Sequence, residues 1–292
     1  MVAQSLKIYE VGPRDGLQSL GETLPVFRKV DLINLLSKAG LNKIEAVSFV
    51  NPKKVPTMEG AEAVYRECRS FLGPDIELGG LVPNQKGLQR AKEAEMTHFN
   101  VFFSPDERFN RQNLGKTLHE AVLDFKISLE GVPKENIRVY VSCAFGTLQN
   151  RIISDSIFKT AVIEAAKLGS TVVLCDTVGI ATPWKVREAI SLAKECYPED
   201  LAMHFHQGLE NDYDIFDNVQ AAIDSGVYQF DSSIGGLGGC PFVHGSRGNL
   251  STEQLVAWAH ERGYYTGVNE NLLDDALEYV QNEILGEREQ CC

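Results

Sequence analysis

The feature that most constrains the fold of this chain is a regular alternation of two kinds of segment. Short runs of β-branched and other apolar residues alternate with longer segments in which apolar residues recur at helical spacing. Eight strands are predicted, at Lys7–Gly12, Lys43–Phe49, Ile76–Leu81, His98–Phe103, Ile137–Cys143, Thr171–Cys175, Leu201–His206 and Tyr228–Ser233. Eight strands separated by helices favour an α/β fold, a (β/α)₈ TIM barrel, over a doubly wound sheet.

Helices are expected between these strands and after the last of them. They are predicted at Val26–Lys38, Met58–Phe71, Gly87–Glu95, Lys116–Glu130, Asp155–Leu168, Pro183–Glu195, Asp212–Ser225, Thr252–Arg262 and Glu270–Ile284. Thr182 before Pro183 indicates a helix start, whereas Gly40 and Gly169 are expected to end helices in the left-handed conformation. No linker interrupts the chain, so one domain is expected over residues 1–292, with the barrel at about 6–265 and a C-terminal helical extension at about 266–292.

Charge and cysteine content exclude several classes of protein. The net charge of −12 argues against a nucleic-acid partner, because a phosphate backbone needs a basic face. Seven cysteines without framework spacing are typical of a reducing compartment. No apolar run approaches the ~18 residues of a membrane-spanning helix, and no leader pattern precedes the first strand. We therefore expect a cytoplasmic protein without membrane contact, in which Cys291 and Cys292 belong to an exposed tail.

The seventh predicted strand carries two histidines, His204 and His206, separated by one residue. Side chains alternate along a strand, so both imidazoles point the same way. Near the carboxyl end of a barrel strand they can face the interior and hold a metal ion. The alternative, a hydrogen-bonded pair of core histidines, stays open on this pattern alone.

The first predicted strand runs into Arg14 and Asp15, which also fall at the mouth of a barrel. A carboxylate there can complete a metal site, and an arginine can hold an anionic oxygen. A surface Arg–Asp pair in a tight turn is the alternative. One carboxylate and two imidazoles suit Mg²⁺ or Mn²⁺, and Zn²⁺ is not excluded.

Three further side chains are candidates for chemistry. Glu45 lies in an apolar strand and faces either the outer helices or the barrel interior, where Arg14 could pair with it. Asp176 follows the sixth strand, where it is either an active-site carboxylate or a cap for its own loop. Cys240 lies in a glycine-rich loop that could close over a ligand, and it is a candidate proton donor unless the loop is a plain connector.

Together these motifs resemble the 3-hydroxy-3-methylglutaryl-CoA lyase family, in order, from about Leu6 to Asn269. The matching stretches are Val11-Gly12-Pro13-Arg14-Asp15-Gly16-Leu17-Gln18, Ile44-Glu45, Ser48-Phe49-Val50, Val141-Ser142-Cys143-Ala144, Asp176-Thr177-Val178-Gly179, His204-Phe205-His206 and Gly236-Leu237-Gly238-Gly239-Cys240-Pro241. The last of these is the most specific, because it distinguishes the lyases from related Claisen-type synthases and aldolases on the same barrel.

The resemblance implies metal-dependent cleavage of a 3-hydroxyacyl-CoA to acetyl-CoA and a keto acid, by a homodimer. The implied metal ligands are Asp15, His204, His206 and Asn249. Arg14 resembles the residue that steadies the enolate oxygen, and Cys240 the residue that transfers a proton. Glu45 and Asp176 resemble the remaining active-site carboxylates. CoA use is implied by the resemblance alone, because the pair Lys53-Lys54 could meet phosphates or could equally be a solvated surface pair.

Three loops depart from the family pattern, and all three lie at the expected mouth of the barrel. They are Gln207–Asn211 after the second histidine, Phe145–Gln149 after the fifth strand, and Val243–Arg247 in the glycine-rich loop. His244 and Arg247 add positive or titratable character, so an acyl group other than 3-hydroxy-3-methylglutaryl is one hypothesis and neutral loop drift is the other. Two alternative functions remain: a Claisen-type acyltransferase, which the Cys-Pro loop disfavours, and a non-catalytic homologue.

Overall fold

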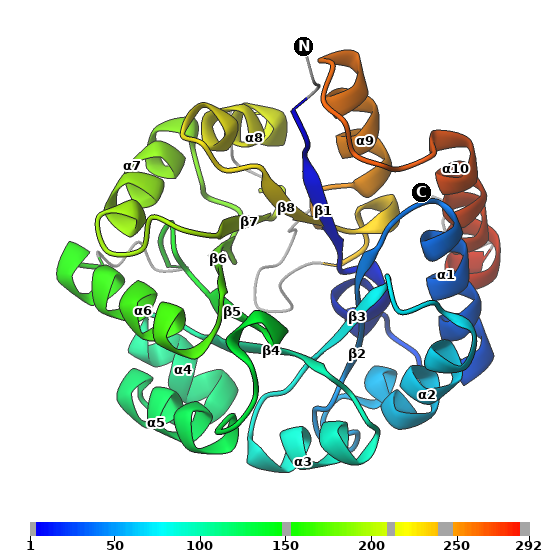
Figure 1. Cartoon of the computed structure of the whole chain (residues 1–292), viewed down its shortest axis with the longest axis horizontal. Helices are drawn as coiled ribbons and strands as arrows, with labels where there is room; N and C mark the ends of the chain where they lie inside the picture. Colours follow the sequence, from blue (N-terminus) through cyan, green and yellow to red (C-terminus); the bar gives the residue numbers. More distant parts are fainter. Residues whose placement is uncertain (1–3, 148–152, 209–213, 239–247, 287–292) are drawn as a thin grey trace.

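The protein is a closed barrel of eight parallel strands surrounded by helices (Figure 1). The computed structural model describes residues 4–147, 153–208, 214–238 and 248–286. The strands are β1 Lys7–Glu10, β2 Lys43–Ser48, β3 Glu77–Leu81, β4 His98–Phe103, β5 Ile137–Val141, β6 Thr171–Asp176, β7 Leu201–Phe205 and β8 Gln229–Ser232. They pair in chain order and β8 closes on β1, which confirms the predicted (β/α)₈ fold.

The helices within the described residues lie outside the ring of strands (Figure 1). They are α1 Val26–Lys38, α2 Ala61–Phe71, α3 Gln85–Glu93, α4 Glu107–Leu114, α5 Leu118–Ser128, α6 Asp155–Leu168, α7 Pro183–Lys194, α8 Ile215–Asp224, α9 Thr252–Glu261 and α10 Glu270–Tyr279. Two π-helical turns, Gly12–Gly16 and Val280–Leu285, follow β1 and α10. The sequence did not predict α4, because only Asn110 of its eight residues is buried and no apolar stripe marks it.

The two faces of the barrel strands have different partners. Outward-facing side chains such as Ile8, Ile44 and Val101 join one large apolar core with the surrounding helices. A smaller group inside the barrel, including Tyr140 and Val173, is separate from that core. The barrel interior also holds buried charged and polar side chains, each of which must find a partner there because burial removes its hydration.

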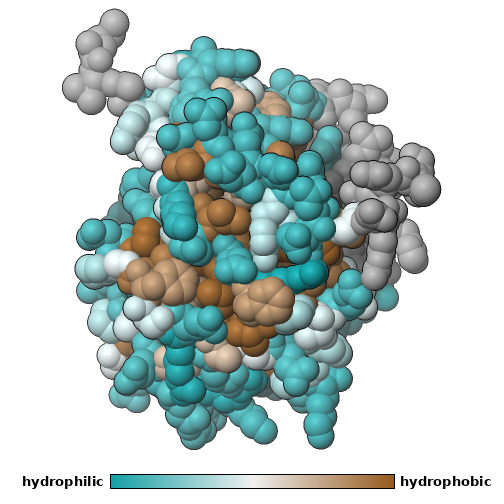
Figure 2. Space-filling model, turned by 90° about the vertical axis from the view of Figure 1, so that its right-hand side faces the viewer, coloured by the Kyte–Doolittle hydropathy of each residue, from teal (hydrophilic) through white to brown (hydrophobic). Residues whose placement is uncertain are grey.

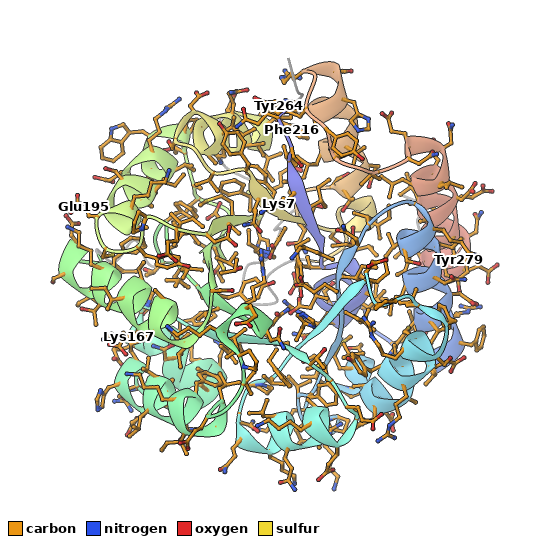
Figure 3. The ribbon with its side chains drawn as sticks, in the orientation of Figure 1. Lys7, Lys167, Glu195, Phe216, Tyr264 and Tyr279 are labelled. Atoms are coloured by element: carbon orange, nitrogen blue, oxygen red, sulfur yellow. The ribbon has the colours of Figure 1, made fainter. Side chains whose placement is uncertain are left out.

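Stacked aromatic rings join α8 to α9 at the surface. The Phe216 and Trp258 rings are 5.6 Å apart and nearly parallel, and Trp258 is 6.2 Å from Tyr264. The Arg262 guanidinium lies 4.3 Å from the centre of the Trp258 ring. Figure 3 shows Phe216 and Tyr264 close together above the start of β1, where Lys7 lies near the middle of the barrel. These ring contacts pack α9 against α8.

The prediction that Gly169 ends a helix in the left-handed conformation is wrong, although that for Gly40 is confirmed at a φ of 98°. Gly169 has an extended backbone with a φ of −130°. A Cβ atom at this position would lie 2.4 Å from the carbonyl oxygen of Ile137, so a close approach to β5 explains the glycine. Neither backbone can move easily, since one ends α6 and the other begins a barrel strand.

Gly169→Ala should therefore lower the free energy of unfolding by about 1–3 kcal/mol, because the new methyl group overpacks against backbone. Gly21→Ala is the matched control, since nothing lies within 4 Å of a Cβ atom there. Urea unfolding of both variants checks the difference. Equal stabilities would show that the contact with Ile137 is not the reason for the glycine.

One side of the molecule carries apolar side chains at the surface. Figure 2 faces the side of α1, α2 and α10 and shows apolar side chains among hydrophilic ones. Phe27 of α1 and Leu272 of α10 are 58% and 38% exposed.

In the described part of the chain, no helix combines the length and the apolar character needed to cross a bilayer.

Candidate active site

Three potential metal ligands converge at the carboxyl end of the barrel. His204 comes from β7, His206 lies just past it, and Asp15 comes from the turn after β1. One ligand atom from each lies within 4.8 Å of the others. The two Nε2 atoms are 3.0 Å apart, and His206 Nε2 is 4.0 Å from Asp15 Oδ2. Ligand atoms about 2.1 Å from a six-coordinate ion are roughly 3 Å apart when adjacent, so these separations fit one shared cation.

Asn249 supplies a fourth ligand atom, an amide oxygen, beside this triad. Its Nδ2 donates hydrogen bonds to Asp15 Oδ2 and to the Leu237 carbonyl oxygen, both at 2.8 Å. The amide orientation is thereby fixed, and Asn249 Oδ1 is buried without a hydrogen-bond partner among the described residues. A buried carbonyl-type oxygen without a donor is costly unless a ligand meets it. The donor set of two imidazole nitrogens and two oxygens therefore fits a divalent cation.

Hydrogen bonds at Nδ1 of each imidazole determine which ring nitrogen is free to bind a metal. His204 Nδ1 lies 3.2 Å from Asp231 Oδ2, and His206 Nδ1 lies 3.2 Å from the carbonyl oxygen of Thr177. Both acceptors require a proton on Nδ1, which leaves each Nε2 as the ligand atom. Asp231 in turn accepts a hydrogen bond of 2.5 Å from Arg138. Sequence reasoning missed both of these charged residues, although an aspartate inside an apolar barrel strand is a usable signal.

Without a metal, the pKa of His204 lies above the ordinary value of a histidine and the pKa of His206 lies below it. Burial alone lowers the pKa of His204, but the hydrogen bond and charge of Asp231 raise it above its ordinary value. Burial and the neighbouring His204 lower the pKa of His206 to about 4. A second proton on His204, at Nε2, and none on His206 Nε2 also explains their close contact, since His204 Nε2 then donates to His206 Nε2.

Metal affinity should therefore weaken as the pH falls. The pKa of His204 is raised, so lowering the pH through that pKa fills the ligand nitrogen with a proton that the metal must displace. Below the raised pKa of His204, the dissociation constant for Mn²⁺ should rise by up to about tenfold for each unit by which the pH falls. Calorimetric titration at several pH values checks this, and a dissociation constant independent of pH would contradict it.

Arg14 and Glu45 form a buried ion pair next to the ligands. Arg14 Nε donates to Glu45 Oε2 at 2.5 Å, and its NH1 nitrogen donates to Asp15 Oδ1 at 2.5 Å. Asn100 donates to the other Glu45 oxygen at 2.7 Å. Burial disfavours the charge on Arg14, but the two carboxylates raise its pKa above the ordinary range. Glu45 thus faces the barrel interior, and it holds the arginine in place between itself and the ligand Asp15.

A cavity of about 290 Å³ opens beside these residues. Its lining includes both histidines, Arg14 and Asp15, with Phe102, Phe109, Asn113 and Tyr140 from the side of β4 and β5. The Tyr140 hydroxyl is buried and has no hydrogen-bond partner in the part of the chain that the structure describes. Burial and the nearby carboxylates Asp231 and Glu45 raise the pKa of Tyr140 well above its ordinary value, so it remains a neutral donor. Sequence reasoning did not identify this side chain.

The remaining candidates from the sequence lie elsewhere or outside the described residues. Asp176 is buried at the end of β6, and its two oxygens accept the backbone N–H groups of Ile180 and Ala181, each at 3.0 Å. It does not line the 290 Å³ cavity. Burial raises its pKa to about 6. Cys240, with its neighbours His244 and Arg247, lies outside the described residues, while Lys53 and Lys54 are exposed.

Buried charges around the cavity do not cancel. Arg14 and Arg138 oppose Asp15, Glu45 and Asp231, and Asp176, which is ionised at neutral pH, adds a further negative charge. Two negative charges are left over if the histidines are neutral. This excess of buried negative charge favours the binding of a divalent cation, which would offset it.

Fold and site together define a (β/α)₈ barrel in which one carboxylate and two imidazoles, at the carboxyl ends of the strands, could hold a metal ion. A family model described as HMGL-like matches residues 5–280, and the chain belongs to that family. It is 37% identical over 272 residues to the hydroxymethylglutaryl-CoA lyase of Pseudomonas mevalonii, covering 91% of this chain and 88% of that protein. A 3-hydroxy-3-isohexenylglutaryl-CoA/hydroxymethylglutaryl-CoA lyase of Pseudomonas aeruginosa is 34% identical over 95% of this chain and 92% of its own length.

A solved structure agrees with these relatives. The lyase of Acinetobacter baumannii, in complex with coenzyme A and 3-methylmalate, superposes with a TM-score of 0.87 at 32% sequence identity. The match covers 100% of this chain and 98% of that one. The family resemblance read from the sequence motifs is thereby confirmed.

Proposed function

We propose that this protein is a divalent-metal-dependent carbon–carbon lyase that cleaves 3-hydroxy-3-methylglutaryl-CoA, or a close relative, to acetyl-CoA and acetoacetate. The observation that carries the proposal is the convergence of Asp15, His204, His206 and the unpaired oxygen of Asn249 beside Arg14 at one cavity. The named activities of the relatives support the same reaction. Mg²⁺ and Mn²⁺ are the ions we propose, because half of the ligand atoms are oxygens.

The proposed reaction breaks the bond between C2 and C3 of the acyl group. A bound divalent ion supplies Lewis acidity that makes the tertiary 3-hydroxyl easier to deprotonate. Loss of that proton turns C3 into the ketone of acetoacetate, and the bonding electrons pass to C2 as the enolate of acetyl-CoA. Arg14 lies where its guanidinium can hold the enolate oxygen, and Glu45 keeps it in that orientation. The proposed proton donor to C2 is Cys240.

Asp176 is the proposed base for the 3-hydroxyl proton. Its pKa of about 6 leaves it ionised at neutral pH yet basic enough to accept a proton. Its oxygens now accept two loop N–H groups, so it must exchange one of these contacts to reach the substrate. Tyr140 is the proposed donor to an acyl oxygen, because its side chain lines the cavity and its hydroxyl proton has no acceptor among the described residues.

The local cations of the centre support an acyl group that carries a carboxylate. Arg14 lines the cavity, and its guanidinium and a bound cation are the groups that could pair with the free carboxylate of a glutaryl-type acyl chain. The P. aeruginosa relative acts on a glutaryl group with a longer 3-substituent, so a bulkier acyl chain is the second candidate. Comparing kcat/KM for the 3-methyl and 3-isohexenyl substrates separates the two.

Product analysis tests the proposed reaction against the condensing alternative. Metal-loaded protein given 3-hydroxy-3-methylglutaryl-CoA should release acetyl-CoA and acetoacetate in equal amounts, with no free CoA. A Claisen-type acyltransferase would instead release free CoA from acetyl-CoA and a 2-oxo acid. Free CoA from acetyl-CoA and a 2-oxo acid, together with no cleavage of 3-hydroxy-3-methylglutaryl-CoA, would overturn the lyase proposal in favour of that alternative.

The remaining proposals concern domain structure, assembly and location. We propose that the chain acts as one domain and as a cytoplasmic homodimer. Cys68, Cys175 and Cys196 form no disulfide bond with any described residue, which supports a reducing compartment. Phe27 and Leu272 supply exposed apolar area that a second copy could cover. Sedimentation equilibrium decides the assembly.

A further inference from the structure

The carboxylate of Glu10 ties together two chain segments that each carry a proposed metal ligand. Glu10 is the last residue of β1, is fully buried, and faces away from the cavity lining. Its Oε1 accepts the backbone N–H of Gly12 at 2.7 Å and that of Ile234 at 3.0 Å. Gly12 begins the turn that leads to Asp15, and Ile234 begins the chain that leaves β8.

The hydrogen bonds continue from both segments until they meet at the ligands. Beyond Ile234, the Gly236 carbonyl oxygen accepts the Asn249 N–H at 3.2 Å, and the Leu237 carbonyl oxygen accepts Asn249 Nδ2 at 2.8 Å. The same Nδ2 donates to Asp15 Oδ2 at 2.8 Å. A closed circuit therefore runs from Glu10 along one segment to Asp15, across to Asn249, and back along the other.

Close packing leaves the circuit little room to adjust. A Cβ atom on Gly12 would lie 2.5 Å from Glu10 Oε1, and one on Gly16 would lie 2.8 Å from the Leu237 side chain. The second Glu10 oxygen accepts the hydroxyl of Thr252 at 2.5 Å, which anchors the carboxylate to the first residue of α9. The two segments thus touch directly, with Glu10 as their shared acceptor.

We propose that Glu10 is a positioning residue that sets the two oxygen ligands, Asp15 and Asn249, relative to the two histidines at the end of β7. The inference rests on the metal centre of the proposed function. Without the Glu10 acceptor, two buried N–H groups lose their partner and the segments must shift to satisfy them. The histidine rings keep acceptors of their own in Asp231 and Thr177. The backbone around His206 also pairs with the Asn249 segment, so the largest shift is expected in the segment that carries Asp15. The distances between the oxygen ligands and the histidine nitrogens, and therefore the affinity for the metal, depend on Glu10.

Calorimetric titration of the metal-free full-length protein with Mn²⁺ tests this. Glu10→Leu, which removes the acceptor, and Glu10→Asp, which shortens its reach, should each raise the dissociation constant about tenfold or more. Glu10→Gln should stay within about twofold of the wild type, because its amide oxygen accepts both N–H groups and its nitrogen donates to Thr252. Phe125→Ala, in the buried face of α5 across the barrel (Figure 1), is the control: it should lower Tm and leave Mn²⁺ binding unchanged.

Two outcomes separate the inference from the function on which it rests. If the wild type does not bind Mn²⁺, the proposed metal centre is wrong and the inference falls with it. If the wild type binds and Glu10→Asp binds equally well, the metal centre stands and the positioning role of Glu10 is overturned. Because Glu10→Asp keeps both charge and polarity, it decides the question even if Glu10→Leu does not fold.

Discussion

Arg14→Gln should lower kcat for cleavage by about 10²–10³-fold while the protein still folds and binds Mn²⁺. The guanidinium is the positive group that lies beside both the metal ligands and the cavity, and the proposed enolate oxygen would lose its main stabilising partner. Glutamine keeps a donor near Glu45 but removes the charge. KM should change less than kcat, since the lost interaction forms mainly in the transition state.

Arg14→Lys is the informative companion variant. A lysine keeps the positive charge but cannot bond Glu45 and Asp15 at once through a planar fork. We expect it to remain well below the wild type in kcat, although less so than glutamine. Steady-state kinetics with saturating Mn²⁺ measure both. If Arg14→Gln keeps a wild-type kcat, the arginine is a structural partner of Glu45 and not part of the reaction.

Asp231→Asn should weaken Mn²⁺ binding by about 10–100-fold, although Asp231 is not itself a proposed metal ligand. The carboxylate holds the proton on His204 Nδ1 and so leaves Nε2 free as a ligand. An asparagine can present its nitrogen to the ring and favour the other tautomer. The substitution also leaves Arg138 without its buried counter-charge, which should cost about 3 kcal/mol of stability.

The stability effect and the metal effect of Asp231→Asn can be separated. Tyr9→Phe is the control, because it alters the same buried cluster: the Tyr9 ring stacks on Arg138, but its hydroxyl contacts Asn100 and neither histidine. It should change stability and leave the dissociation constant for Mn²⁺ unchanged. Equal Mn²⁺ affinities for wild type and Asp231→Asn would show that Asp231 does not orient His204.

Most of the fold could be predicted from the sequence because barrel strands and amphipathic helices have distinct periods. All eight strands are where the apolar runs indicated, apart from small shifts at their ends. The exceptions have physical causes. Helix α4 is polar on nearly every face, so its period gave no signal. Gly169 reflects a close backbone contact with the start of β5, which a sequence pattern does not reveal.

The convergence of side chains could be predicted where their position is local in the sequence. Strand alternation points both imidazoles of His204-Phe205-His206 the same way, and Arg14 and Asp15 lie in the turn just past the end of β1. Their roles in metal binding and catalysis stay predictions. Asp231 and Tyr140 were missed because their roles depend on contacts between strands, and a single buried polar residue in a strand does not reveal its partner. The role of Asp176 stays a prediction, since its carboxylate faces its own loop.

The most direct test of the account is release of acetyl-CoA from 3-hydroxy-3-methylglutaryl-CoA by purified protein loaded with Mg²⁺ or Mn²⁺, with His204→Ala measured in parallel. We expect robust turnover by the wild type, its loss on chelation, and a fall of about 10³-fold or more in His204→Ala, because that variant lacks a metal ligand. Turnover that survives both chelation and His204→Ala would contradict the proposed metal-dependent lyase.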